Sequence, residues 1–301
     1  MRRIFIAGIA ALGLILGWSS TASAQGCSIG SAGATQIVAA GQDGRQVRLH
    51  RPAGSHSGAL PLVFVLHGSG STGEAVLRDS KLEALADQKG FLLAAPDGAI
   101  ALGSGYAWNI PGVPTTEGKV PGADVPSDTA YVLSIIDRLV SAGCADPARV
   151  YVTGISGGGR MTSWLGCVAA DRFAAIAPVV GLRAGNPLES DPRRPDPETC
   201  KPSAPVSVLA FAGDADTVNP VAGGGAGYWQ YSMDAALARW AELDGCDSPP
   251  ARINFTDKVL VTSYTGCKDG VSVAGWIYHG LGHVWLADND AMWRFFARHH
   301  R

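Results

Sequence analysis

The sequence has almost no net charge, because 24 lysine and arginine residues face 26 aspartate and glutamate residues. Such a balance gives no electrostatic reason to expect a nucleic acid or an anionic membrane surface as a partner. Internal repeats and interdomain linkers are also absent, so 301 residues with 47% hydrophobic content predict a single domain with one large core. We therefore expect a monomer that acts on small or neutral molecules.

Long apolar segments are missing after the first residues. The stretch from Ile4 to Trp18 follows two arginines and precedes the small residues "SSTASA". This order is typical of a secretory signal peptide, and the stretch is shorter than the roughly 20 residues that a membrane-spanning helix needs. We predict a signal peptide over residues 1–24 and a secreted domain over residues 25–301. A retained membrane anchor is the alternative.

The six cysteines include no Cys-x-x-Cys pair. In a cytosolic protein six cysteines would raise metal or redox chemistry, but in an exported protein disulfides are expected. Proximity in the sequence and then elimination give the pairs Cys167 with Cys200, Cys246 with Cys267, and Cys27 with Cys144. One or more free buried thiols are the alternative. We expect neither a metal nor another cofactor.

Several apolar runs end at a glycine or a turn, as strands buried on both faces do. These runs are "LPLVFVLHG", "FLLAAPDG", "FAAIAPVVG" and "APVSVLAFAGD". Helical patterns alternate with them, for example over residues 127–142, where Ser127 and Asp128 offer a helix start. This alternation predicts an α/β fold with a mostly parallel central sheet and helices on both faces.

The remaining segments give weaker signals. "RQVRLHRP" alternates like an exposed strand, and residues 98–126 are rich in glycine and proline, which predicts a long functional loop. Pro187 to Pro202 reads as a charged, proline-rich excursion. Further strands are predicted over residues 150–153, 259–264 and 271–278, and further helices over 81–89, 158–170, 228–243 and 288–300.

A serine lies between glycines at residues 154–158, in the pattern Gly-x-Ser-x-Gly. The bare pattern is weak evidence in a glycine-rich chain, but here it joins a predicted strand to a predicted helix, as a nucleophile elbow does. Flanking glycines leave room for a strained backbone, and the helix dipole favours a developing negative charge. Ser156 is thus a candidate nucleophile, and a small residue in a tight turn is the alternative.

A serine hydroxyl needs a histidine to take its proton and a carboxylate to hold that histidine. His283 follows the last predicted strand, in "HGLGHVW", and Asp214 and Asp216 follow an earlier strand, in "FAGDADTVNP". The order Ser, Asp, His is that of the α/β-hydrolase fold. The residues alone leave the choice between the two aspartates open.

Acyl transfer also needs donors for an oxyanion. The backbone nitrogen of Gly157, directly after the serine, is one candidate. A second donor is expected in the "HGSGS" turn after the first buried strand, most plausibly the nitrogen of Ser69. This turn has an alternative reading as a simple glycine exit from the strand.

The combined motifs resemble the secreted feruloyl esterases and polyhydroxybutyrate depolymerase-like esterases. The matching segments are "LVFVLHGSGSTGEA", "DQKGFLLAAPDG", "RVYVTGISGGGRM", "FAAIAPVVG", "PVSVLAFAGDADTVNP", "RWAELDGC" and "YTGCKDGVSVAGWIYHGLGHVW". The resemblance implies Ser156 as nucleophile, Asp216 as acid, His283 as base and a disulfide between Cys246 and Cys267. It covers nearly all of residues 25–301.

The sequence also departs from this family pattern. Ala212 and Gly213 replace His-Gly before the acid, and Asn219 and Pro220 replace Val-Pro after it. Leu286 stands where a proline is common, and Gly157 where Asn or Ala is frequent. The changes around the acid loosen the choice between Asp214 and Asp216, although the spacing Gly-x-x-Asp still points to Asp216. The changes at Leu286 and Gly157 remove no catalytic group, and we expect them to reshape the substrate cleft.

Two tryptophans are expected to contact the substrate. Trp108 lies in the long loop and Trp285 two residues after His283, and an aromatic face suits a ferulate ring or a sugar. Core packing is the alternative for both.

The resemblance implies a serine esterase for hydroxycinnamoyl or acetyl esters of plant polysaccharide. A polyhydroxyalkanoate depolymerase and a catalytically inactive binding module of the same fold are the alternatives.

Overall fold

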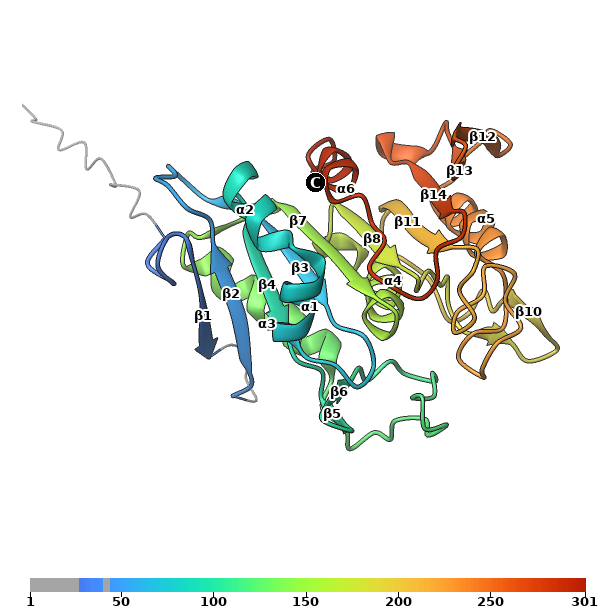
Figure 1. Ribbon diagram of the computed structural model, residues 1–301, viewed down its shortest axis with the longest axis horizontal. Coiled ribbons are helices and arrows are strands. Elements are labelled where there is room, and N and C mark those ends of the chain that lie inside the picture. The colour runs from blue at the N-terminus through green and yellow to red at the C-terminus, as the bar shows by residue number, and fades with distance from the viewer. Residues whose placement is uncertain (1–26, 40–43) are drawn as a thin grey trace, which may run out of the picture.

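The computed structural model describes residues 27–39 and 44–301, and a 10-stranded sheet with helices on both faces runs through it (Figure 1). The predicted signal peptide, residues 1–24, lies outside the described residues. No helix in the described part of the chain is long and apolar enough to cross a membrane.

The strands of the sheet follow the order β1-β2-β4-β3-β7-β8-β11-β14-β13-β12. Neighbouring strands from β4 to β14 are parallel, and the strands outside them at both ends pair antiparallel. The strands are β1 (Ala34–Ala39), β2 (Gln46–Arg51), β3 (Leu60–Leu66), β4 (Leu92–Pro96), β7 (Ala145–Ile155), β8 (Ala175–Val179), β11 (Ser207–Gly213), β12 (Ala251–Thr256), β13 (Val259–Tyr264) and β14 (Val273–Tyr278). This architecture confirms the predicted α/β class with a mostly parallel sheet.

The helices cover the two faces of the sheet in two groups. They are α1 (Gly73–Ser80), α2 (Leu82–Lys89) and α6 (Asn289–Phe296) on one face, and α3 (Asp128–Ser141), α4 (Gly157–Val168) and α5 (Met233–Leu243) on the other. Strand β3 shows why both faces are needed: Phe64 packs with the second group, and Val63 and Val65 pack with the first. Alternating side chains of one buried strand thus belong to two hydrophobic clusters.

The structure differs from the sequence-based prediction mainly at the edges. Strand β2, predicted as exposed, lies between β1 and β4 and buries Val47 and Leu49. The edge strands β1 and β12 were not predicted, because most of their side chains face solvent and carry no apolar pattern. Helix α1 was also missed, and α5 begins at Met233 because Ser232 caps it.

Two segments predicted as irregular contain short hairpins. The long loop includes β5 (Ile100–Leu102) and β6 (Gly105–Ala107), and the proline-rich excursion includes β9 (Pro187–Leu188) and β10 (Asp191–Pro195). Short 3-10 turns occur at Ala170–Arg172 and Lys268–Gly270.

Three disulfides form in the predicted pairing and leave no free cysteine in the described part of the chain. Cys27–Cys144 ties the segment before β1 to the segment before β7, and Cys167–Cys200 ties α4 to the segment before β11. Cys246–Cys267 joins the two segments that flank the β12–β13 hairpin.

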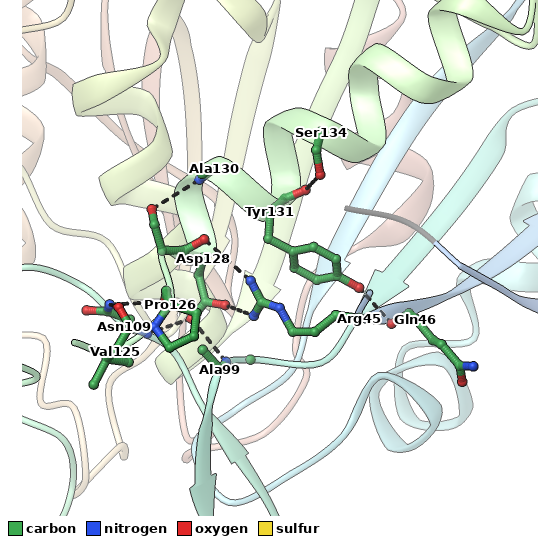
Figure 2. Close-up of polar contacts among 12 residues, drawn as sticks. Arg45, Gln46, Ala99, Asn109, Val125, Pro126, Asp128, Ala130, Tyr131 and Ser134 are labelled. Carbon is green, nitrogen blue, oxygen red and sulfur yellow. Dashed lines mark hydrogen bonds and ion pairs between the residues drawn. The ribbon is translucent and has the colours of Figure 1, made fainter. Parts of the chain in front are cut away.

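A buried carboxylate anchors the long loop 98–126 (Figure 2). Asp128, fully buried in the first turn of α3, accepts hydrogen bonds from the backbone nitrogens of Asn109 (2.7 Å) and Ala99 (3.3 Å). Its other oxygen pairs with Arg45 at 2.5 Å, and the Arg45 guanidinium stacks 3.8 Å above the Tyr131 ring. Burial raises the pKa of Asp128. The segments that precede and follow the β5–β6 hairpin are thereby held at the start of α3.

The first turn of α4 packs directly against the end of β3. A Cβ atom at Gly158 would overlap the carbonyl oxygen of Leu66, and one at Gly154 would lie 2.8 Å from the Leu66 Cβ. We expect Gly158→Ala to lower the free energy of unfolding by about 1–3 kcal/mol through overpacking, measured by chemical denaturation. Gly227→Ala is the control, because the nearest atom to its added Cβ is 3.8 Å away. Equal stability of the two variants would contradict this packing.

Asp244 gives the fold a pH dependence. Its side chain is fully buried at the end of α5. The Oδ1 atom accepts a hydrogen bond from the Val206 nitrogen (3.0 Å), and Oδ2 has no hydrogen-bond partner among the described residues. Burial raises the pKa of Asp244 from 3.8 to about 7. Between these values the folded chain holds a proton that the unfolded chain releases, so stability falls as the pH rises, by at most about 1.4 kcal/mol per pH unit.

We expect Asp244→Asn to remove this decline, because the amide does not ionise. Denaturation of both proteins at several pH values between about 4 and about 7 measures the slope for each. Parallel slopes would show that Asp244 is not the titrating group.

Candidate active site

Ser156 occupies a strained turn between β7 and α4. Its backbone angles are φ 55° and ψ −114°, a conformation that residues other than glycine rarely adopt. The Ser156 nitrogen donates to the carbonyl of Val179 (2.9 Å), and its carbonyl accepts from the nitrogen of Arg160 (2.9 Å). This is the local geometry of a nucleophile elbow.

Asp216 is buried and pairs with His283, which is partly exposed and lines one cavity with Ile155, the residue before Ser156. The Nδ1 atom of His283 lies 2.7 Å from Oδ2 of Asp216, whose side chain is only 1% exposed. The other carboxylate oxygen accepts from the nitrogens of Val218 (2.8 Å) and Asn219 (2.9 Å). Because an ionised carboxylate only accepts hydrogen bonds, Nδ1 carries the imidazole hydrogen, and Nε2 keeps a lone pair for a proton.

Asp214 contacts a different histidine. It lies 2.7 Å from Nδ1 of His279 and accepts from the nitrogen of Gly280 (2.7 Å), and both side chains of this second pair are more than 40% exposed. The hydrogen bond from His279 lowers the pKa of Asp214. Of the two aspartates between which the sequence left the choice open, Asp216 is the one that touches His283.

Asn219, one of the departures from the family pattern, connects the acid loop to the serine turn. Its side-chain nitrogen donates to the carbonyl of Val180 at 2.6 Å. Val180 has a positive φ of 42°, which is unusual for a β-branched residue, and its nitrogen is bound to the carbonyl of Phe211. The amide therefore holds a strained backbone directly after the residue that binds Ser156.

The two predicted oxyanion donors lie against each other. A Cβ atom at Gly157 would come within 2.9 Å of the Ser69 nitrogen and 2.5 Å of its hydroxyl. A Cβ at Gly68 would lie 3.6 Å from the Cβ of Ser156. The turn after β3 is thus packed onto the start of α4, although 88 residues separate Ser69 from Gly157 in the sequence.

The two tryptophans have different environments. Trp285 is half-buried and lines, with His283, Ile155 and Gly68, a cavity of about 590 Å³. Trp108 is only 4% exposed, and its indole nitrogen donates to the carbonyl of His67 (2.8 Å). Trp108 therefore packs in the core, which is the alternative that the sequence left open, and its contact with a substrate stays a prediction. The role of Trp285 stays a prediction.

Two residues near the serine were not identified from the sequence. His67 is buried, and its burial lowers the pKa of the imidazole. The Gly98 nitrogen donates to Nε2 of His67 (3.1 Å). The hydrogen of the neutral ring is therefore on Nδ1, which donates to the Gly68 carbonyl (2.8 Å). Arg160 donates to the Ser69 hydroxyl. A helix that begins at Gly157 places Arg160 one turn after Ser156, and this spacing was the available signal.

Within residues 27–39 and 44–301, no group of three or more His, Cys, Asp or Glu side chains is arranged to hold a metal ion.

The sequence matches known esterases. The family described as Esterase PHB depolymerase matches residues 46–190. Feruloyl esterase B of Piromyces equi is 30% identical over 83% of this chain and 44% of its own length. The poly(3-hydroxybutyrate) depolymerase of Ralstonia pickettii is 29% identical over 77% of this chain and 49% of its own length. The chain thus spans about half the length of these curated relatives.

The fold also matches a solved esterase structure. The acetyl xylan esterase from Aspergillus awamori superimposes with a TM-score of 0.60 at 17% identity, over 88% of this chain and 99% of that one. At this identity the likeness concerns the fold alone. The chain is thus similar in sequence to esterases named feruloyl esterase and poly(3-hydroxybutyrate) depolymerase, and it has the α/β-hydrolase fold of solved esterases.

Proposed function

We propose that the chain is a secreted serine carboxylester hydrolase that cleaves hydroxycinnamoyl or acetyl esters of plant cell-wall polysaccharide. The observation that carries the proposal is the pair of Asp216 and His283, 2.7 Å apart, whose histidine lines one cavity with Ile155, the residue before a serine held at φ 55°. Feruloyl esterase B among the similar sequences supports the substrate class. Three disulfides and the sequence of residues 1–24 support secretion.

In this mechanism Nε2 of His283 takes the hydroxyl proton of Ser156 while the serine oxygen bonds to the ester carbonyl carbon. The carbonyl oxygen becomes an oxyanion, which the backbone nitrogens of Ser69 and Gly157 stabilise. The ester C–O bond then breaks, and His283 returns the proton to the leaving alcohol. A water molecule, deprotonated by His283, then attacks the carbonyl carbon of the acyl-serine. The bond from that carbon to the serine oxygen breaks, His283 returns the proton to the serine oxygen, and the acid leaves.

Replacement of Ser156 by alanine is expected to abolish turnover of a p-nitrophenyl ester, because no other group supplies the attacking oxygen. The thermal midpoint should stay close to that of the unchanged protein, since the side chain only loses its hydroxyl. Labelling by a fluorophosphonate probe should disappear in the same variant. Turnover by Ser156→Ala would refute the mechanism, and an unreactive parent protein would indicate an inactive binding module instead.

The two histidine–aspartate pairs offer a matched control for the acid. Asp216→Asn should lower kcat by about 10³- to 10⁴-fold, because the amide favours the wrong tautomer of His283. Asp214→Asn changes the same chemical group two residues away, in the exposed pair with His279, and should leave kcat within about twofold. Equal losses in the two variants would remove Asp216 from its role.

A second candidate function is the hydrolysis of a polyhydroxyalkanoate. Exposed aliphatic side chains flank the acid and the base: Val218 (44% exposed), Leu281 (40%) and Val284 (51%). Such side chains suit contact with an apolar polymer surface.

A substrate panel separates the two functions. We expect kcat/KM to be at least about tenfold higher on methyl ferulate or acetylated xylan than on short 3-hydroxybutyrate oligomers, a difference of roughly 1.4 kcal/mol in transition-state binding. Initial rates on equal concentrations of each ester measure it. Clearing of a polyester suspension without activity on methyl ferulate would favour the depolymerase.

A further inference from the structure

Arg160 is a buried cation without an acidic partner. Its side chain is 4% exposed and lies one helical turn after Ser156, and it forms no ion pair with any residue in the described part of the chain. Burial and the nearby charge of Arg183 lower the pKa of Arg160 to about 10, so it remains charged at neutral pH. A charge withdrawn from water without a counterion is costly, and residues of this kind gather at functional sites.

The contacts of Arg160 lead to one neighbour at the candidate site. Its Nη2 donates to the hydroxyl oxygen of Ser69 (3.3 Å), while the guanidinium lies 4.2 Å from the centre of the Tyr228 ring. Its Nε has no hydrogen-bond partner among the described residues. The polar contact of the charged group is therefore made with the residue whose backbone is proposed to bind the oxyanion.

A substrate carboxylate does not fit beside Arg160. The cavity that the guanidinium lines with Ser69, Gly157 and Trp108 measures only about 10 Å³. This is the space of about one water molecule. The positive charge must therefore act through Ser69.

Gly157 makes room for the Ser69 hydroxyl. A Cβ atom at position 157 would come within 2.5 Å of the Ser69 oxygen, so the hydroxyl rests where a side chain would otherwise stand. The Ser69 hydroxyl thus lies next to the backbone of Gly157, whose nitrogen is the other proposed oxyanion donor. The glycine that departs from the family pattern is thus coupled to the position of this hydroxyl.

We propose that Arg160 is a positioning residue that turns the Ser69 hydroxyl into a third oxyanion donor, beside the backbone nitrogens of Ser69 and Gly157. A hydroxyl has one hydrogen to donate and two lone pairs, and arginine has only hydrogens to donate. When Arg160 occupies a lone pair, the hydroxyl hydrogen must point elsewhere, and the nearby oxyanion is the acceptor that appears during the reaction. The inference rests on the proposed serine esterase mechanism.

The added donor acts mainly in the transition state. The carbonyl oxygen carries a full negative charge only in the tetrahedral intermediate, so a bond to it raises kcat more than it changes KM. The positive charge of Arg160 polarises the hydroxyl and strengthens this bond.

The test is a double-mutant cycle of Ser69→Ala and Arg160→Met, assayed on a p-nitrophenyl ester. Ser69→Ala keeps the backbone nitrogen and should lower kcat by about 10- to 100-fold with KM within about twofold. Arg160→Met should cause a loss of similar size, and the double variant should be no slower than Ser69→Ala alone. Arg160→Lys should recover part of kcat, because it restores a positive donor.

Arg183→Met is the matched control for loss of a buried arginine. Arg183 is 5% exposed and hydrogen-bonds to the backbone carbonyl oxygens of Gly185 and Tyr228. Its replacement should lower the thermal midpoint without the loss in kcat.

A boronic acid inhibitor, which forms a tetrahedral adduct with a serine, should bind Ser69→Ala more weakly by the same factor as kcat falls. This measurement serves if Arg160→Met fails to fold.

Unchanged kcat in Ser69→Ala, or losses that multiply in the double variant, would overturn the inference. In those cases an inactive Ser156→Ala variant and fluorophosphonate labelling of the parent protein would still leave the esterase mechanism standing. Turnover by Ser156→Ala would instead remove both.

Discussion

The close approach of α4 to the end of β3 is the constraint on which the candidate site depends. Glycines at positions 154, 158 and 159 let the backbone of this turn touch Leu66 and Gly181 without an intervening side chain. Because the helix begins so near the sheet, Ser156 is held at φ 55° and its nitrogen is bound to Val179. Every other group of the site is arranged around a serine that this packing has already fixed.

The parallel pairing of β11 with β14 brings Asp216 and His283 together. Both strands end at the same edge of the sheet. The segments that follow them are joined by backbone hydrogen bonds, from the Asp214 nitrogen to the Tyr278 carbonyl (3.1 Å) and from the Ala215 nitrogen to the Leu281 carbonyl (3.0 Å). Two histidine–aspartate pairs form across these loops. The two pairs differ in exposure. The carboxylate of Asp216 is enclosed and fully hydrogen-bonded, whereas the side chains of Asp214 and His279 are open to water.

The departures from the family pattern are connected by contacts. Asn219 stands where valine is usual in the family, and its side-chain nitrogen donates to the carbonyl of Val180. Val180 has a strained positive φ and lies close to the serine turn. Gly157 leaves space for the hydroxyl of Ser69, which Arg160 then contacts. Two of the departures, Asn219 and Gly157, therefore make or permit contacts close to Ser156.

The sequence by itself determined the central strands, the start of α3 at its Ser127 cap and the elbow around Ser156, whereas it only suggested the disulfide pairing that the structure shows. These features follow from local patterns: apolar runs, a capping hydroxyl, and glycines on both sides of a serine. The exposed edge strands β1 and β12 lack such a pattern and were missed.

Only the tertiary structure decided which aspartate meets His283, that Trp108 is buried, and that Arg160 reaches Ser69. Asp214 and Asp216 are chemically identical and two residues apart, so local sequence cannot distinguish them. Their roles depend on contacts between segments far apart in the chain, which exist only when the sheet has assembled and its loops meet at one edge.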